Sequence, residues 1–432
     1  MRQGLIYVLD KRTGVRKDQA RFDLISAHGS IMTLKHGRQF LSIPGPTTVP
    51  DEVLGAMHRP AIDIYGGEGG GELLGITTRC LKDLKTIFAT TGDTYIYIAN
   101  GHGAWEASIA NVLSRGDTIL VLESGRFAVG WGEFAKSMGI SIERVTGDWR
   151  RAVDPQKVED ALRADTENKI KAVLVVQVDT ASGCVNDIEA IRKAMDAAGH
   201  DALLMVDTIA SLACMPFEMD KWGVDVAVGG SQKGLMTPPG LSFVAANAKA
   251  KERHKTADLV TSYWNWSSRD QEEHYRKYAG TPPVHLLFGL RKAMDMILEE
   301  GLPSIFERHR LLAGATHAAV EVWRKGGSFD FNITEPNERS VSVTTLLLRD
   351  DLRPEPIRAF CFDRLGVTLG LGIGDLSGKA FRIAHMGHVN APMMMGTLGA
   401  LEVALDSLGL TDENSKGGVA AAAAYLAGAL RD

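Results

Sequence analysis

The sequence predicts an α/β fold: a large domain with a mostly parallel sheet, followed by a smaller C-terminal α+β domain. From about residue 90, short apolar runs alternate with longer stretches of helical periodicity, which is typical of βαβ units. After about residue 285 this alternation gives way to two long helical stretches and a more irregular mixture. The chain of 432 residues also exceeds the size at which a single core usually stops growing, which favours two domains.

The strands of the large domain are predicted from short apolar runs, and its helices from the longer periodic stretches between them. The predicted strands are Tyr95–Ala99, Thr118–Leu122, Ala172–Gln177, Ala202–Val206, Val224–Val228 and Leu241–Ala246. The predicted helices are Gly103–Ser114, Val129–Met138, Asp154–Ala164 and Asp187–Ala198. In such a sheet, ligand sites form at the carboxyl ends of the strands.

The C-terminal part is predicted to mix helices and strands. The predicted helices are His285–Glu300, Leu302–Lys325, Pro356–Leu365, Met393–Leu408 and the alanine-rich tail Gly417–Leu430, and the predicted strands are Ser340–Leu348 and Phe381–His385. We therefore divide the chain into an N-terminal extension without a catalytic role (residues 1–40), a large domain (41–290) and a small domain (291–432).

Composition and charge favour a cytoplasmic enzyme that acts on small molecules. The net charge is −5, which favours neither nucleic acid nor an anionic membrane as a partner. No apolar run reaches the roughly 18 residues of a membrane helix, and residues 1–30 lack the pattern of a signal peptide. The four cysteines are widely spaced, as is typical of reduced thiols, and we predict no metal site.

Three polar features follow predicted strands. Lys233 stands among small residues just after Val224–Val228, where lost solvation lowers the pKa of an amine and lets it react with an aldehyde. Asp207 ends the strand Ala202–Val206, and a carboxylate there can hold a pyridinium nitrogen protonated. The turn Asn100–Gly103 leads into a helix whose N-terminus can bind a phosphate.

Each feature also has a plain structural interpretation. Lys233 could be a solvated lysine, Asp207 a helix cap before Thr208, and the turn an ordinary strand–helix connection. Along the chain, the phosphate-binding turn comes first, then the carboxylate for the ring nitrogen, and then the lysine. Taken together, the three features indicate a site for pyridoxal phosphate.

The blocks around these residues resemble those of the class V aminotransferases of fold type I, particularly the serine–glyoxylate and alanine–glyoxylate aminotransferases. The resemblance extends from about residue 40 to the C-terminus. The matching stretches are Ile43-Pro44-Gly45-Pro46-Thr47, Gly101-His102, Leu204-Met205-Val206-Asp207, Gly230-Ser231-Gln232-Lys233-Gly234, Pro238-Pro239-Gly240, Tyr278 with Thr281-Pro282-Pro283, and Phe381-Arg382-Ile383. It implies a homodimeric transaminase that uses pyridoxal phosphate to move an amino group from serine, alanine or a similar small amino acid to glyoxylate or another small 2-oxo acid.

The resemblance also implies the contacts of the cofactor. Lys233 would bind it covalently and shuttle the α-proton of the substrate, and Asp207 would pair with the ring nitrogen. Phe127 would stack on the ring, and Thr180 would lie near its phenolic oxygen. The other cofactor residues would be Gly101, His102 and Gln232 at the phosphate, Asn100 as a further amide donor there, and Ile209.

Further residues are assigned to the substrate and to the subunit contact on the same grounds. Arg382 would grip the substrate carboxylate as a two-pronged donor. Gly45 and Tyr65 would also lie at the substrate site. Tyr278 and Thr281 would reach the phosphate in the neighbouring subunit.

One segment departs from the family pattern and leaves the amino donor open. Relatives usually have a His-Arg pair where residues 62–72 are rich in glycine. Tyr65 and Glu68 could recognise a different amine, such as ureidoglycine or aspartate, or be loop residues. A lyase or a cysteine desulfurase on the same fold remains an alternative, although the apolar helical context of Cys361 favours a core position over a catalytic one. A cofactor-binding regulator is a third possibility, but the sequence contains no recognisable DNA-binding helix-turn-helix.

Overall fold

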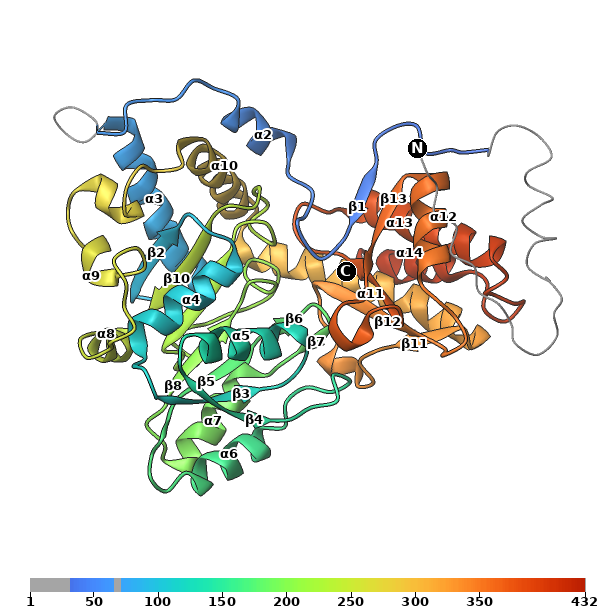
Figure 1. Cartoon of the computed structure of the whole chain (residues 1–432). Coiled ribbons are helices and arrows are strands. Elements are labelled where there is room, and N and C mark those ends of the chain that lie inside the picture. The colour runs from blue at the N-terminus through green and yellow to red at the C-terminus, as the bar shows by residue number, and fades with distance from the viewer. Residues whose placement is uncertain (1–31, 66–70, 432) are drawn as a thin grey trace, which may run out of the picture.

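The structure is a computed structural model that describes residues 32–65 and 71–431. These residues form a larger and a smaller α/β unit, linked in the chain by the helices α10 (Val284–Glu300) and α11 (Leu302–Trp323) (Figure 1). The predicted fold class is confirmed, because the larger unit contains a mostly parallel sheet. Most of the predicted N-terminal extension, residues 1–31, lies outside the described residues.

The larger unit is built on a sheet with the order β2-β10-β9-β8-β5-β3-β4, in which β10 runs antiparallel to both neighbours and the other pairs are parallel. Its strands are β2 (Asp93–Tyr97), β3 (Thr118–Leu122), β4 (Ser141–Val145), β5 (Ile170–Val176), β8 (Leu203–Asp207), β9 (Val226–Gly230) and β10 (Ser242–Ala246). A small hairpin joins β6 (Val178–Asp179) to β7 (Cys184–Val185). The helices are α2 (Asp51–Met57), α3 (Gly71–Phe88), α4 (Gly101–Val112), α5 (Arg126–Ser137), α6 (Pro155–Ala164), α7 (Ile188–Ala198), α8 (Ala248–His254) and α9 (Trp266–Arg269), followed by the 3₁₀ turn η1 (His274–Tyr278).

All the strands and helices predicted for the large domain are present, with boundaries shifted by a few residues. Strand β4 was missed. It lies at the edge of the sheet, and most of its side chains are exposed, including Ser141, Glu143 and Arg144. An edge strand of this kind lacks the continuous apolar run by which the buried strands were recognised.

The smaller unit has a second sheet with the order β1-β13-β14-β12-β11. Its strands are β1 (Phe40–Ser42), β11 (Phe329–Phe331), β12 (Val343–Leu348), β13 (Val367–Leu371) and β14 (Ala380–Ala384), and its helices include α12 (Glu355–Leu365), α13 (Ala391–Ser407) and α14 (Gly418–Ala429).

Strand β1 joins the small sheet, although it is separated from the rest of that sheet by the whole larger unit. It pairs in parallel with β13, from Phe40 opposite Val367 to Ser42 opposite Leu369, and thereby satisfies backbone groups at the edge of β13. The division predicted at residue 290 falls inside α10, which packs against α2 and α3 of the larger unit. The exact domain boundaries stay a prediction.

The carboxyl edge of the large sheet brings distant residues together. Strands β8 and β9 are parallel neighbours, with Asp207 opposite Val228, so Asp207 and the turn after Gly230 meet at one edge. Apolar clusters cover both faces of this sheet and fix the strands beneath that edge. Within the described residues, no helix is both long and apolar enough to cross a membrane.

Candidate active site

Lys233 lies in the turn after β9 with only 9% of its surface exposed. Its Nζ donates a hydrogen bond to the carbonyl of Pro44. Gly45 stands directly against it with φ +97°, and a Cβ atom at residue 45 would lie 2.4 Å from Nζ. Glycine is therefore required at residue 45 both by the backbone conformation and by the space that the lysine fills. Burial, and secondarily the charge of Arg382, lowers the pKa of Lys233 to about 8.

Asp207, the last residue of β8, points into the same pocket and is 3% exposed. One carboxylate oxygen accepts the indole N–H of Trp105 at 2.7 Å, and the other accepts the backbone N–H of Ile209 at 2.7 Å. Burial raises the pKa of this carboxyl to about 7, against the effect of these two donors. The acid and the amine predicted from the sequence thus face one cavity.

The turn before α4 forms the third part of the site. Asn100 is the N-cap of the helix, and its side-chain oxygen accepts the N–H groups of His102 (3.1 Å) and Gly103 (3.3 Å). The His102 N–H, which was assigned to a phosphate, is therefore already engaged by Asn100. The cap uses the amide oxygen of Asn100, which leaves its NH₂ group as the donor that an anion could accept from.

Lys233, Asp207 and the first turn of α4 line one cavity of about 460 Å³, part of it open to solvent. Asn100 itself is not one of its lining residues. The lining residues come from the carboxyl ends of several strands and from the start of α4 and α5: Gly101, His102, Trp105, Phe127, Val176, Val178, Thr180, Asp207, Ile209, Ala210, Gln232 and Lys233. Gly101 is in direct contact with Ile209, because a Cβ at residue 101 would lie 2.4 Å from the Ile209 Cδ1 atom.

Phe127 owes its position to a buried carboxylate that the sequence did not single out. One oxygen of Asp179 accepts the N–H groups of Phe127 (2.8 Å) and Ala128 (3.1 Å) in the first turn of α5, and the other accepts that of Ala181 (3.0 Å). Burial raises the pKa of this carboxyl, against the effect of these N–H donors. Asp179 thus joins the hairpin that carries Thr180 to the helix that carries Phe127.

Arg382 lies on β14 of the smaller unit and reaches across to the larger one. Its Nε donates to the carbonyl of Leu371 at 2.7 Å and its Nη1 to that of Thr180 at 2.8 Å. It is 7% exposed and forms no ion pair with the described residues. Burial lowers its pKa to about 10, which still leaves it charged at neutral pH. Its remaining N–H donors lie beside Thr180, which lines the cavity, although Arg382 itself is not one of the lining residues.

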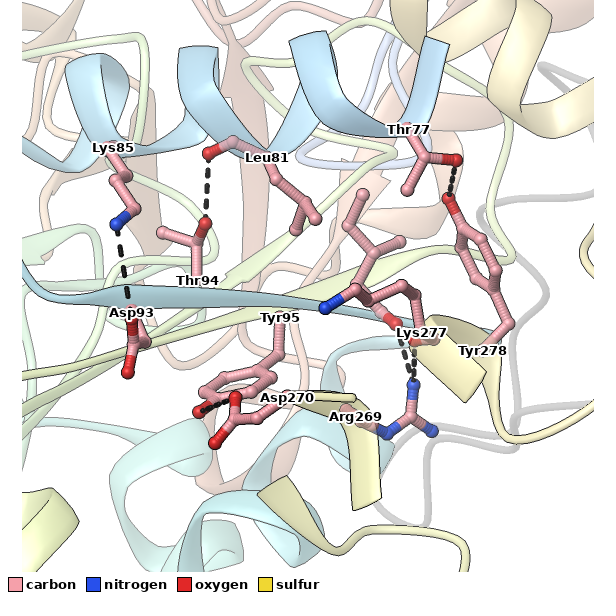
Figure 2. A pocket seen from close by; sticks show the side chains of 11 residues that line it. Thr77, Leu81, Lys85, Asp93, Thr94, Tyr95, Arg269, Asp270, Lys277 and Tyr278 are labelled. Carbon is pink, nitrogen blue, oxygen red and sulfur yellow. Dashed lines mark hydrogen bonds and ion pairs between the residues drawn. The ribbon is translucent and has the colours of Figure 1, made fainter. Parts of the chain in front are cut away.

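Tyr278 packs against α3 within this chain, and its predicted contact with a neighbouring subunit stays a prediction. It is 1% exposed, and its hydroxyl lies 2.7 Å from the Oγ1 of Thr77, which also contacts the Nε2 of His274 at 2.7 Å. Figure 2 shows Tyr278 and Thr77 pointing toward each other at the end of a different cavity, between α3, β2 and the α9–η1 segment. In this chain Tyr278 therefore anchors η1 to α3, whereas Thr281 is exposed.

Tyr65 is not brought to the Lys233 cavity. It is 73% exposed, and its backbone N–H bonds to the side chain of Asp63. The glycine-rich residues 66–70, including Glu68, lie outside the described residues. The remaining predicted cofactor residues, Ile209 and Gln232 among them, line the cavity together with Lys233.

Two residues of the site, Trp105 and Asp179, were missed as functional candidates. Trp105 follows Gly101 by four residues, which places both on the same face of α4, and this spacing could have identified it. Asp179 had no comparable signal, because its partners lie about 50 residues earlier in the chain.

Comparison with known proteins identifies the family. The family model "Aminotransferase class-V" matches residues 40–372. A serine–glyoxylate aminotransferase of Methylorubrum extorquens is 36% identical over 400 residues, covering 91% of this chain and 97% of the relative. An L-aspartate–glyoxylate aminotransferase of Paracoccus denitrificans is 35% identical over 385 residues, covering 89% and 95%.

A solved structure agrees with this relationship. The pyridoxamine–pyruvate aminotransferase from Mesorhizobium loti has a TM-score of 0.82 and 26% identity, and the match covers 92% of this chain and 100% of that one. The chain therefore belongs to the class-V aminotransferases, a family of enzymes that in general depend on pyridoxal phosphate.

Proposed function

We propose that this protein binds pyridoxal phosphate at Lys233 and transfers an amino group from serine, alanine or a similar small amino acid to glyoxylate or another small 2-oxo acid. The observation that carries the proposal is the shared cavity of Lys233 and Asp207, in which a buried amine of lowered pKa faces a buried carboxylate.

The residues of this cavity fit the cofactor. The Gln232 side chain has a buried amide oxygen without a hydrogen-bond partner among the described residues, next to the turn at Gly101. Because the two ends of an amide are exchanged by rotation, this group can present a donor to a phosphate there. Asn100 and the N-terminus of α4 add further donors. Phe127 would cover one face of the ring, and Asp207 would hold a proton on its nitrogen.

The cofactor, when bound, supplies an electron sink for the charge that develops at the substrate α-carbon. Lys233 Nζ would act first as a general base that removes the α-proton of the substrate and then as a general acid that delivers this proton to the cofactor. With a pKa of about 8, a substantial fraction of the amine is neutral near physiological pH. Arg382 would bind the substrate carboxylate through the N–H donors that Leu371 and Thr180 leave free.

The substrates are proposed from the relatives and from Arg382. Both glyoxylate enzymes described above share the acceptor and differ in the donor, serine or L-aspartate. Arg382 forms no ion pair with the described residues and lies beside Thr180 of the cavity. A single guanidinium there suits an amino acid with one carboxylate, which favours serine or alanine over aspartate. Ureidoglycine remains a candidate donor.

We also propose a homodimer and a cytoplasmic location. Thr281 is exposed, and Tyr278 lines a second cavity with its hydroxyl beside Thr77. Both would contact the cofactor of the partner subunit. The described cysteines are all free and buried, as suits a reducing compartment.

A half-reaction screen tests the proposal. The purified enzyme with bound cofactor is mixed with serine, alanine, aspartate or ureidoglycine in turn, and the yellow absorbance is followed. A true donor bleaches the absorbance, and glyoxylate restores it. Lys233→Ala should abolish turnover, whereas Lys193→Ala, an exposed lysine paired with Glu189, should not. If no amine bleaches the enzyme, transamination is refuted.

A desulfurase is the less favoured alternative. Cys361 lies inside α12 with no exposed surface, and burial raises the pKa of its thiol to about 12. A nucleophilic cysteine needs access and thiolate character, and none of the four cysteines is exposed in the described part of the chain.

A further inference from the structure

Trp105 is the only side chain that donates a hydrogen bond to Asp207 within the described residues. The indole N–H points at one carboxylate oxygen from 2.7 Å, and both residues are almost fully buried. An indole N–H can donate but cannot accept. The bond therefore favours the ionised carboxylate over the protonated acid, which would offer a weaker acceptor.

Asp207 needs such help because its surroundings oppose its charge. Burial is the largest influence on its pKa and raises it to about 7. The N–H groups of Ile209 and Trp105 lower this pKa, the nearby carboxylate of Asp179 raises it, and the charge of Lys233 lowers it weakly. Without the indole donor, the carboxyl would bind a proton at neutral pH more readily.

Trp105 belongs to a cluster of aromatic rings. Trp105 stacks on Trp131, with ring centroids 6.1 Å apart and 16° between planes, and meets His102 and Phe134 edge to face. The indole N–H of Trp131 is buried and has no partner among the described residues. Trp131 thus has the same ring in the same cluster but makes no bond to Asp207, which makes it the matched control.

We infer that Trp105 is a positioning residue that keeps Asp207 ionised and directs its carboxylate toward the ring nitrogen of the cofactor. The inference rests on the proposed function, because it assumes that pyridoxal phosphate occupies the cavity. Helix α4 would then contribute to the site twice. Its first turn would lie near the cofactor phosphate, and Trp105, one turn later, would hold the carboxylate of Asp207 on β8.

The test compares two ligands of the apoprotein, pyridoxal phosphate and its analogue with C–H in place of the ring nitrogen. Both carry the same aldehyde and phosphate, so the ratio of their dissociation constants reports the contact between the ring nitrogen and Asp207. In Trp105→Phe we expect the preference for pyridoxal phosphate to fall by about tenfold, as for the loss of one hydrogen bond to a charged group. The pH below which the preference is lost should rise by about one unit.

Three controls make the outcome decisive. Trp131→Phe should keep the wild-type preference. Asp207→Asn should lose the preference, and adding Trp105→Phe to it should change nothing further. If Trp105→Phe keeps the wild-type ratio and pH dependence, or if Trp131→Phe loses them equally, the inference is overturned. If the wild-type apoprotein takes up neither ligand, the proposed function fails and the inference fails with it.

A second measurement leaves residue 105 unchanged and so covers the case in which Trp105→Phe does not fold. In apoprotein with ¹⁵N-labelled tryptophan, one indole N–H signal should shift with pH as Asp207 titrates, and this shift should be absent in Asp207→Asn. An indole spectrum with no such signal in the wild type would overturn the inference.

Discussion

At the residue scale, the burial of Lys233 sets the pH range in which its amine can act. The pKa of about 8 lies well below the usual value for lysine, because the folded site disfavours the charged form. Below this pKa the amine is protonated in both the folded and the unfolded chain. Between it and the ordinary lysine pKa, only the unfolded chain holds the proton, so stability from this group rises with pH across that window.

The lowered pKa of Lys233 also predicts the pH range in which the apoprotein reacts with an aldehyde. Trapping of pyridoxal phosphate on Lys233 by borohydride, measured by mass spectrometry at a series of pH values, should rise with a midpoint near pH 8. A lysine peptide should show its midpoint near pH ~10.4. A midpoint for the protein equal to that of the peptide would contradict the burial argument.

Arg382 allows a prediction about substrate binding. Arg382→Lys keeps a positive charge but loses the planar fork that is held by Leu371 and Thr180. We expect KM for the amino acid donor to rise by roughly 10–100-fold, corresponding to about 1.5–3 kcal/mol of lost charged hydrogen bonding. The rate with an amine that has no carboxylate should be unchanged. An equal loss with both substrates would show that Arg382 acts on something other than the carboxylate.

At the element scale, helix α5 depends on a carboxylate from a distant hairpin. Asp179 is fully buried, and its oxygens satisfy N–H groups in the first turn of the helix and in its own hairpin. These groups have no other partner once the side chain is removed, because the first N–H groups of a helix lie outside its internal bonding.

Asp179→Ala should therefore destabilise the fold and loosen Phe127 together. We expect the free energy of unfolding to fall by roughly 2 kcal/mol, and the cofactor to dissociate faster, as measured by denaturant titration and by the loss of yellow absorbance on dialysis. Asp187→Ala, which removes the exposed N-cap of α7, should cost about 1 kcal/mol without changing cofactor release. Equal cofactor release from both variants would argue against a specific role for Asp179.

At the scale of the whole molecule, the two units are joined by buried hydrogen bonds close to the site. The fully buried Asn332 of the smaller unit donates to the carbonyls of Trp149 (2.7 Å) and Ser182 (2.9 Å) of the larger unit. Ser182 lies in the same turn as Thr180, to which Arg382 donates. Arg382 and Asn332 thus both contact this turn of the larger unit.

Asn332→Ala should weaken both stability and substrate binding. The loss of two buried hydrogen bonds should lower the free energy of unfolding by about 2–4 kcal/mol. KM for the amino acid substrate should rise, while cofactor affinity stays near that of the wild type. Asn390→Ala, which removes the cap of α13 within the smaller unit, should lower stability by about 1 kcal/mol and leave KM unchanged. A wild-type KM in Asn332→Ala would show that the hydrogen bonds of Asn332 between the two units do not contribute to substrate binding.

The sequence by itself determined the features that depend on local patterns. Apolar runs located the buried strands. Because Lys233, Asp207 and the turn at Asn100 each follow such a strand, the sequence predicted that they lie at the carboxyl edge of a parallel sheet. Local chemistry was sufficient there, because strand order and parallel pairing bring those ends together without any further information.

Only the tertiary structure decided the contacts that join distant segments. It paired β1 with β13 across more than 300 residues, aimed Trp105 at Asp207, and placed Asp179 under α5. It also turned Tyr278 inward onto Thr77. Each of these depends on which buried donor finds which acceptor once the units have packed, and a buried polar group is satisfied by its neighbours in space rather than by its neighbours in the chain.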